Sequence, residues 1–144
     1  MPHARDISGF SAAKYGGRWN SRGTHIVYTS INSSLAQLEN LVHFDEPISP
    51  PDLYMAVIEI KTDDLIYELP DAGYPGYWQQ PDNPENKAIG DQWILENKFL
   101  ACKVRSAINP EEFNLLLNPL YPEYHDLVTI NSIRQLKNDA RLVW

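Results

Sequence analysis

The sequence predicts a single α+β domain, spanning residues 1–144, in which two or three helices pack on a twisted, strand-rich sheet. The chain has 144 residues, the size of one ordinary domain. Short runs of β-branched and aromatic residues recur along it, and two segments repeat apolar residues at helical spacing. The single cysteine, Cys102, excludes an internal disulfide. A chain of this length buries enough apolar surface to fold without one.

The first half of the chain predicts three strands and one helix. Thr24–Ser30 alternates between two faces and is typical of a strand. Ser34 and Gln37 form a capping box before leucine and valine residues at helical spacing, which predicts a helix at about 34–44. Two runs rich in β-branched and aromatic residues predict strands at Leu53–Ile60 and Leu65–Leu69.

The second half begins with a stretch that suits no regular element. Residues 70–86 contain four prolines and several aromatic residues, which predicts a long surface loop packed by its own aromatic rings. Lys87–Lys98 has the periodicity of a helix. The remaining strands are predicted at Phe99–Val104, Phe113–Leu117, Leu127–Ile130 and Leu142–Trp144.

Charge and composition exclude several classes of protein. Twelve basic residues against nineteen acidic ones give a net charge of −7, which argues against direct nucleic-acid binding. No apolar run approaches the length of a membrane span, and the N-terminus lacks a signal pattern, so we expect a soluble, cytoplasmic protein with no membrane partner. The histidines and the cysteine have no metal-binding spacing, so we expect no metal.

The loop from Gly16 to Gly23 is the part around which the rest is organised. It contains three glycines and two arginines within eight residues. Glycine lets the backbone approach a ligand closely, and Arg18 and Arg22 carry planar donor groups that match phosphate oxygens. The segment before Thr24 is basic although the protein is acidic, which favours a small anionic ligand over a polymer. An exposed turn with solvated arginines stays open as an alternative.

Four side chains have the chemistry to break an N-glycosidic bond. Arg18 can bind a pyrophosphate, and Tyr28 on the following strand can stack on an aromatic base. Glu39 shares a helix face with apolar residues and can stabilise a developing positive charge, while Ser106 can bind a ribose hydroxyl or position that carboxylate. Structural roles also suit each of them: a turn for Arg18 and Ser106, the core for Tyr28, and a solvated helix edge for Glu39.

The order of short motifs resembles the RES domain, the toxin half of bacterial RES–Xre toxin–antitoxin pairs. The similarity covers nearly the whole chain from about Asp6, and its motifs are Gly16–Asn20, Tyr28–Thr29, Leu35–Glu39, Gly90–Trp93, Val104–Ala107, Asn114–Pro119 and Asp139–Leu142. The family is named for an Arg, a Glu and a Ser, which fall here on Arg18, Glu39 and Ser106. Two features depart from its pattern: the chain starts too late to supply all of the usual first strand, which suggests a trimmed start, and Arg105 replaces a common proline.

The resemblance implies a fold similar to the ADP-ribosyltransferase toxins, with a split sheet that clamps NAD+ as the substrate and with no separate cofactor. Arg18 would then hold phosphate, Tyr28 would cover the nicotinamide, Glu39 would stabilise the oxocarbenium ion, and Ser106 would orient ribose or Glu39. Trp19 and Asn118 are further NAD+-binding candidates.

The resemblance also implies a partner and a choice of acceptor. An Xre-family antitoxin would occlude the active site, with a possible homodimer of this chain inside the complex. The expected reaction is NAD+ cleavage with water or phosphate as acceptor, depleting NAD+ and arresting growth. A mono-ADP-ribosyltransferase acting on a host protein, or a non-catalytic nucleotide- or partner-binding module, stays open as an alternative.

Overall fold

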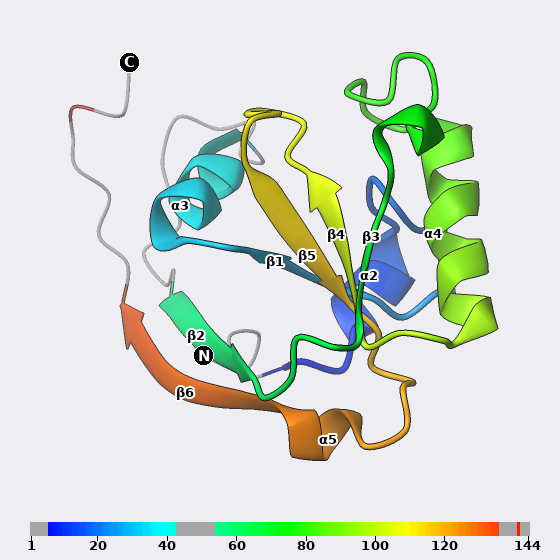
Figure 1. Cartoon of the computed structure of the whole chain (residues 1–144). Helices are drawn as coiled ribbons and strands as arrows, with labels where there is room; N and C mark the ends of the chain where they lie inside the picture. The colour runs from blue at the N-terminus through cyan, green and yellow to red at the C-terminus, as the bar shows by residue number, and fades with distance from the viewer. Residues whose placement is uncertain (1–5, 43–53, 136–140, 142–144) are drawn as a thin grey trace.

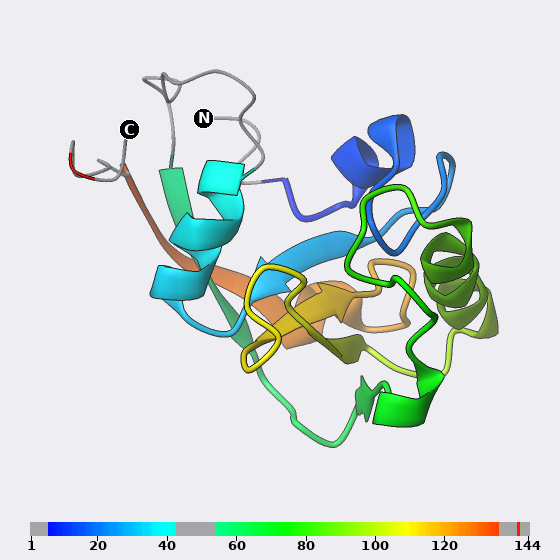
Figure 2. The ribbon, with the colours of Figure 1, turned by 90° about the horizontal axis from the view of Figure 1, so that it is seen from above.

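The chain forms two β-sheets with helices at their sides (Figure 1). The computed structural model describes residues 6–42, 54–135 and 141. In chain order the elements are α2 (Phe10–Tyr15), β1 (Val27–Ser30), α3 (Ser33–Val42), β2 (Tyr54–Ile60), β3 (Ile66–Glu68), the 3-10 turn η1 (Asp71–Gly73), α4 (Pro84–Glu96), β4 (Ala101–Arg105), β5 (Phe113–Leu117), α5 (Tyr124–Leu127) and β6 (Val128–Gln135). Figure 2 shows α3 and α4 on opposite sides of the strands.

The strands divide into a mixed sheet and an antiparallel pair. The larger sheet has the order β1-β5-β4-β3, in which β3 runs parallel to β4 and the other neighbours are antiparallel. The smaller sheet pairs β2 with β6 and has a register shift between Val57 and Ile58. This confirms the predicted α+β class and the mixed, split sheet. Four α-helices lie in the described residues, where two or three were predicted, because α2 and α5 are too short to show a period in the sequence.

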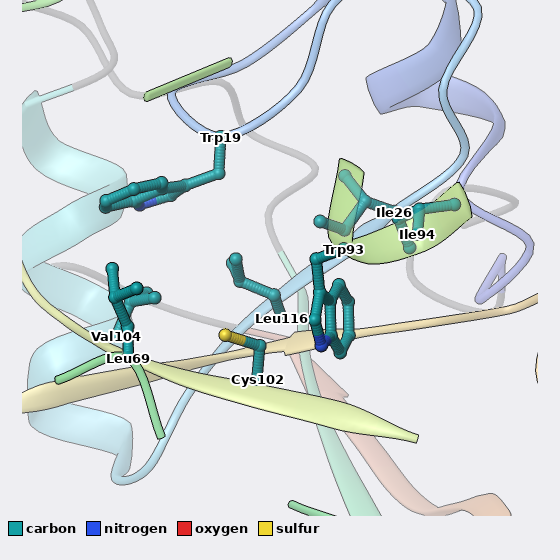
Figure 3. Packing of buried hydrophobic residues seen from close by; sticks show 8 residues of the cluster. All are labelled: Trp19, Ile26, Leu69, Trp93, Ile94, Cys102, Val104 and Leu116. Atoms are coloured by element: carbon teal, nitrogen blue, oxygen red, sulfur yellow. The ribbon is translucent and has the colours of Figure 1, made fainter. Parts of the chain in front are cut away.

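Each face of the larger sheet carries a buried apolar cluster. Leu116 on β5 faces one apolar cluster, shown in Figure 3, with Trp19, Trp93, Cys102 and Val104. Its neighbour Leu117 faces a second cluster, which β2 and β6 cover, because successive side chains of a strand point to opposite faces. Burial raises the pKa of the Cys102 thiol to about 12, so this cysteine is an inert part of the core.

Helix boundaries differ from the predicted ones because of their caps. Helix α4 begins at Pro84, three residues earlier than predicted, because the Asn83 side chain accepts hydrogen bonds from the backbone N–H groups of the first turn. Proline is tolerated at this first position, where its missing N–H costs nothing. Helix α3 is capped by Asn32, whose Oδ1 accepts the Leu35 N–H at 2.8 Å, in place of the predicted Ser34.

The ends of the strands also shifted from the sequence-based ranges. Strand β1 begins at Val27, after the turn that closes the glycine-rich loop, and β6 continues to Gln135, well beyond the predicted Ile130. The long β6 follows from its pairing with all seven residues of β2. The strand predicted at Leu142–Trp144 lies outside the described residues.

Candidate active site

A cavity of about 1120 Å³ opens where the glycine-rich loop, β1, α3 and β2 meet. Arg18, Tyr28 and Glu39 all line it. Ser106 is fully buried and bonds to Glu39 directly behind the cavity wall. The structure therefore brings together the four side chains that the sequence suggested, although they come from separate parts of the chain.

Helix α4 fixes the backbone of the glycine-rich loop. The Lys87 ammonium donates to the Gly17 carbonyl at 2.6 Å, and Asp91 Oδ1 accepts the Ser21 N–H at 2.9 Å. A Cβ on Gly90 would lie 1.6 Å from the Trp19 carbonyl oxygen, so only glycine permits this contact between helix and loop. Lys87 and Asp91 lie one turn apart on the helix and hold neighbouring parts of the loop.

The environment of Asp91 favours its charged form. Partial burial alone raises the pKa of this carboxyl, but hydrogen bonds from Ser21 and Thr24 and the nearby Lys87 ammonium outweigh burial, and the pKa lies below its ordinary value. Asp91 is therefore an ionised anchor for the loop at neutral pH.

The guanidinium of Arg18 is positioned by the segment at residues 70–83, which precedes α4. Its Nη1 donates to the carbonyl oxygens of Trp78 at 3.1 Å and Gln80 at 3.0 Å. An arginine has five N–H donors, and the described residues offer no acceptor for the other three. The predicted aromatic packing of this loop is confirmed, since the Tyr74 and Trp78 rings lie 4.8 Å apart. The same Trp78 carbonyl also accepts from the buried Asn86 at 2.7 Å, which ties the loop to α4.

Tyr28 presents its ring to the cavity and buries its hydroxyl. The phenol donates to Asn20 Oδ1 at 2.7 Å and accepts the Trp19 N–H at 2.9 Å. Burial raises the pKa of Tyr28 well above its ordinary value, and the hydrogen bond from the Trp19 N–H lowers it by less. The residue as a whole is 40% exposed. Tyr28 thus offers an aromatic face, and its proton stays on the phenol.

Ser106 acts on Glu39 from within the core. Its hydroxyl donates to Glu39 Oε1 at 2.5 Å and accepts the Asn109 N–H at 3.2 Å. Ser106 is completely buried, whereas Glu39 is half-buried and lines the cavity. Of the two tasks considered for Ser106, this geometry favours positioning the carboxylate.

Two predicted NAD+-binding residues are buried in the fold. Trp19 borders the cavity but is only 2% exposed, because its indole packs against Tyr74 and Trp78, and its backbone N–H donates to Tyr28. Asn118 is fully buried at the end of β5, where its amide donates to Asn97 Oδ1 at 2.7 Å and to the Phe99 carbonyl at 3.2 Å. It does not line the cavity. Asn118 therefore has a structural role at this end of the sheet.

The arginines near the cavity differ in whether they line it and whether their guanidinium is already bonded. Arg22 is exposed and does not line the cavity. Arg105 lines the cavity, but its guanidinium is bound to Asp71 at 3.1 Å and to the Pro110 carbonyl at 2.7 Å. Arg18 is thus the arginine best placed to meet an anionic ligand.

Sequence reasoning missed the residues that support the site. Asn20 is fully buried, and besides accepting the Tyr28 hydroxyl its amide donates to the carbonyls of Ala12, Ser21 and Thr24. Its place inside the glycine-rich loop was the available signal. Lys87 and Asp91 had a signal too, since they are spaced four apart on a predicted helix.

Two further kinds of site are absent from the described parts of the chain. Residues 6–42, 54–135 and 141 hold no group of three or more His, Cys, Asp or Glu side chains that could bind a metal ion. In the same ranges no helix has the length and apolar character of a membrane span.

The described residues form a small α+β fold with a cavity that is lined by an arginine, a tyrosine and a serine-bound carboxylate. The chain belongs to the RES domain family, which matches residues 2–144, and this confirms the resemblance seen in the sequence. It is 32% identical to the Prs ADP-ribosylating toxin of a Sphingobium species, over 97% of this chain and 88% of that protein. It is also similar to proteins named Toxin Res from Yersinia enterocolitica (33% identical, 94% and 89% covered) and Photorhabdus laumondii (34% identical, 94% and 87% covered).

Proposed function

We propose that this protein is a toxin enzyme that binds NAD+ in the cavity and breaks its nicotinamide–ribose bond. The observation that carries the proposal is the convergence of Arg18, Tyr28 and Glu39 on one cavity, with Ser106 bonded to Glu39. A volume of about 1120 Å³ suits a ligand the size of a dinucleotide. The family membership and the relatives' names support the toxin class.

Binding would use the donor groups and the ring that face the cavity. The three remaining N–H donors of Arg18 suit the oxygens of a pyrophosphate, which an arginine binds in a planar, paired geometry. The face of Tyr28 suits the nicotinamide ring, since stacking of two aromatic planes adds to the burial of apolar surface.

The chemical step would place positive charge on the sugar. As the bond from C1′ to the nicotinamide nitrogen breaks, its electron pair goes to that nitrogen and neutralises the pyridinium, and the ribose becomes an oxocarbenium ion. The Glu39 carboxylate stabilises this cation, and Ser106 keeps the carboxylate in place. An acceptor then forms a new bond to C1′. The first choice of acceptor is water or phosphate, which would deplete cellular NAD+.

A specific observation favours a second acceptor. The Sphingobium relative is named for ADP-ribosylating Prs. By that analogy this protein would transfer ADP-ribose to a protein side chain, with slow turnover when the target is absent.

Release of free nicotinamide from NAD+ tests the proposed function. We expect purified protein to release nicotinamide with water or phosphate present. Glu39→Gln should reduce the rate at least about a hundred-fold, as for removal of one group that stabilises the transition-state charge. Arg18→Ala should lower kcat/KM about 10- to 100-fold, because it removes the charged hydrogen bonds to the pyrophosphate. Arg22→Ala, from the same loop but away from the cavity, is the matched control and should stay near the wild-type rate.

The outcomes separate the candidate functions. A mass increase on one protein in a cell lysate, with little release in its absence, would favour transfer to a protein. No nicotinamide release under any of these conditions would refute NAD+ cleavage. Growth arrest that survives both Arg18→Ala and Glu39→Gln would favour a non-catalytic module.

The rim of the cavity supports a protein partner. Tyr15, Ile31, Val57 and Ile108 line the cavity and are 65%, 46%, 45% and 37% exposed. Exposed apolar side chains that border a polar site are typical of an interaction surface. An antitoxin of the Xre family would cover this rim in the cytoplasm and occlude the site, and co-purification with such a partner should suppress nicotinamide release.

A further inference from the structure

We propose that Ser30 and Asn114 form a subsite that binds a hydroxyl group of the nicotinamide ribose. The inference rests on the proposed function and deepens it, because it names the part of the substrate that the middle of the sheet recognises. Both residues line the cavity, on neighbouring strands. Neither was among the candidate site residues that the sequence suggested.

Strand register places the pair on the same face of the sheet as Tyr28. Ser30 lies directly opposite Asn114 in the pairing of β1 with β5, and Tyr28 lies opposite Leu116. Side chains two residues apart on a strand share a face, and directly paired residues do as well. Ser30 and Asn114 therefore lie beside Tyr28, one step along the strands.

The same register places the pair between Tyr28 and Ser106. Asn114 is opposite Val104 on β4, and Ser106 follows two residues later, where its N–H bonds to the Glu112 carbonyl and extends the ladder. We call directly paired residues of neighbouring strands a row. Two residues along a strand span about 7 Å, so the row of Ser30 and Asn114 lies about 7 Å from the row of Tyr28 and about 7 Å, on the other side, from the row of Ser106.

This order along the sheet matches the order of groups in the substrate. The nicotinamide would stack on Tyr28, and the carboxylate held by Ser106 would act at C1′ of the attached sugar. A ribose joined to that nicotinamide must then lie over the middle row, where Ser30 and Asn114 are the polar side chains.

The hydrogen bond between Ser30 and Asn114 leaves one donor group and one acceptor group available to bind a sugar hydroxyl. The Ser30 hydroxyl donates to Asn114 Oδ1 at 2.8 Å. Asn114 Nδ2 therefore keeps its two N–H donors, for which residues 6–42, 54–135 and 141 provide no acceptor, and the Ser30 oxygen keeps its lone pairs. A donor beside an acceptor complements a sugar hydroxyl, which is both. Asn114 is only half-buried, so a ligand in the cavity can reach it.

Substitutions combined with deoxy substrates test the subsite. The substrates are NAD+, its analogues that lack the 2′- or the 3′-hydroxyl on the nicotinamide ribose, and the analogue that lacks the 3′-hydroxyl on the adenosine ribose. We expect Asn114→Ala to lower kcat/KM for NAD+ about ten-fold, and Ser30→Ala to lower it about three-fold, the size of a lost hydrogen bond. On the analogue without the bound hydroxyl, neither substitution should change kcat/KM more than about two-fold.

A matched control separates recognition from folding. Thr29 is the neighbour of Ser30 on β1 and its side chain lies on the opposite face of the strand. It also borders the cavity, but its hydroxyl donates to the Leu115 carbonyl at 2.9 Å. Thr29→Val loses a similar hydroxyl and should keep the wild-type preference for NAD+ over each deoxy analogue. Thermal unfolding of all variants identifies a loss of folding, and if Asn114→Ala does not fold, Ser30→Ala carries the same comparison.

The failure of this inference differs from the failure of the proposed function. Suppose that the wild-type protein releases nicotinamide, but each substitution lowers kcat/KM by the same factor on NAD+ as on both analogues deoxygenated at the nicotinamide ribose. The subsite is then refuted and NAD+ cleavage stands. The subsite is also refuted if the substitutions lower kcat/KM for NAD+ but not for the analogue that lacks the adenosine 3′-hydroxyl, because the pair would then bind the other sugar. If the wild-type protein neither binds nor cleaves NAD+, both proposals fail together.

Discussion

Gly17 packs so closely against Tyr28 that a single added methyl group tests the site. A Cβ added to Gly17 would lie 2.7 Å from the Tyr28 hydroxyl oxygen and 2.9 Å from Asn20 Oδ1. Ordinary contacts of this kind are several tenths of an ångström longer. Gly17→Ala must therefore push the Tyr28 ring away from its place or break its hydrogen bond to Asn20.

The size of the effect follows from what is displaced. Overpacking at a well-packed position costs about 1–3 kcal/mol, and loss of the buried hydrogen bond between Tyr28 and Asn20 costs a similar amount. We expect the free energy of unfolding to fall by about 1–3 kcal/mol, which for a chain of this size lowers Tm by roughly 4–12 °C. The displaced ring should also lower kcat/KM for NAD+ at least about ten-fold, since a misplaced contact group costs that much or more.

Gly76 supplies the matched control for this substitution. A Cβ at Gly76 meets no atom within 4 Å, and Gly76 does not have the positive φ of Gly9, Gly16 or Gly23. Gly76→Ala makes the same chemical change in another loop and should leave both Tm and nicotinamide release near the wild-type values. Thermal unfolding by circular dichroism and the nicotinamide assay measure both quantities. If Gly17→Ala and Gly76→Ala behave alike in both assays, the tight packing of Tyr28 is not required.

Two further predictions concern groups around the site. Ser106→Ala should lower kcat for nicotinamide release about 10- to 100-fold with little change in KM. The reason is that it removes a charge-assisted hydrogen bond to Glu39 and no substrate contact. A raised KM with unchanged kcat would instead show that Ser106 contacts the substrate. Asp91→Asn tests the lowered pKa of Asp91. The ionised carboxylate should add to the free energy of unfolding fully above about pH 5. That contribution should disappear as the pH falls below the ordinary pKa of 3.8 toward the lower pKa in the folded protein. Urea unfolding at several pH values measures it, and a difference between wild type and variant that stays constant down to pH 2.5 would contradict the assignment.

Strands were predictable because short runs rich in β-branched and aromatic residues are typical of a sheet that packs against a core. Phe113–Leu117 was predicted with its observed ends, since Asn118 and Pro119 stop it in the sequence. The start of α4 is hard to read from the sequence because Pro84 suits both a loop and the first turn of a helix. The cap of α3 was missed because Asn32, Ser33 and Ser34 are three consecutive capping residues, and the path of the backbone decides among them.

The sequence indicated which residue types form the site, but it did not show that these residues lie close together in the fold. Ser106 and Glu39 are 67 residues apart, and the strand order β1-β5-β4-β3, which is not the order of the chain, is what brings them together. The supporting role of Asn20 depends on how the loop folds back on Tyr28, which no residue pattern specifies. Asn118 matched a family motif, but its burial at the end of a strand is a property of the packed structure.

The two-ended attachment of Arg18 has a thermodynamic consequence. Its backbone lies in a loop bonded to α4 through Lys87, and its guanidinium is bonded to the carbonyls of Trp78 and Gln80. A free arginine loses about 2 kcal/mol of rotamer entropy when a ligand immobilises it. Here folding has already paid most of that cost, so even a short diphosphate fragment should meet a side chain that needs little further ordering.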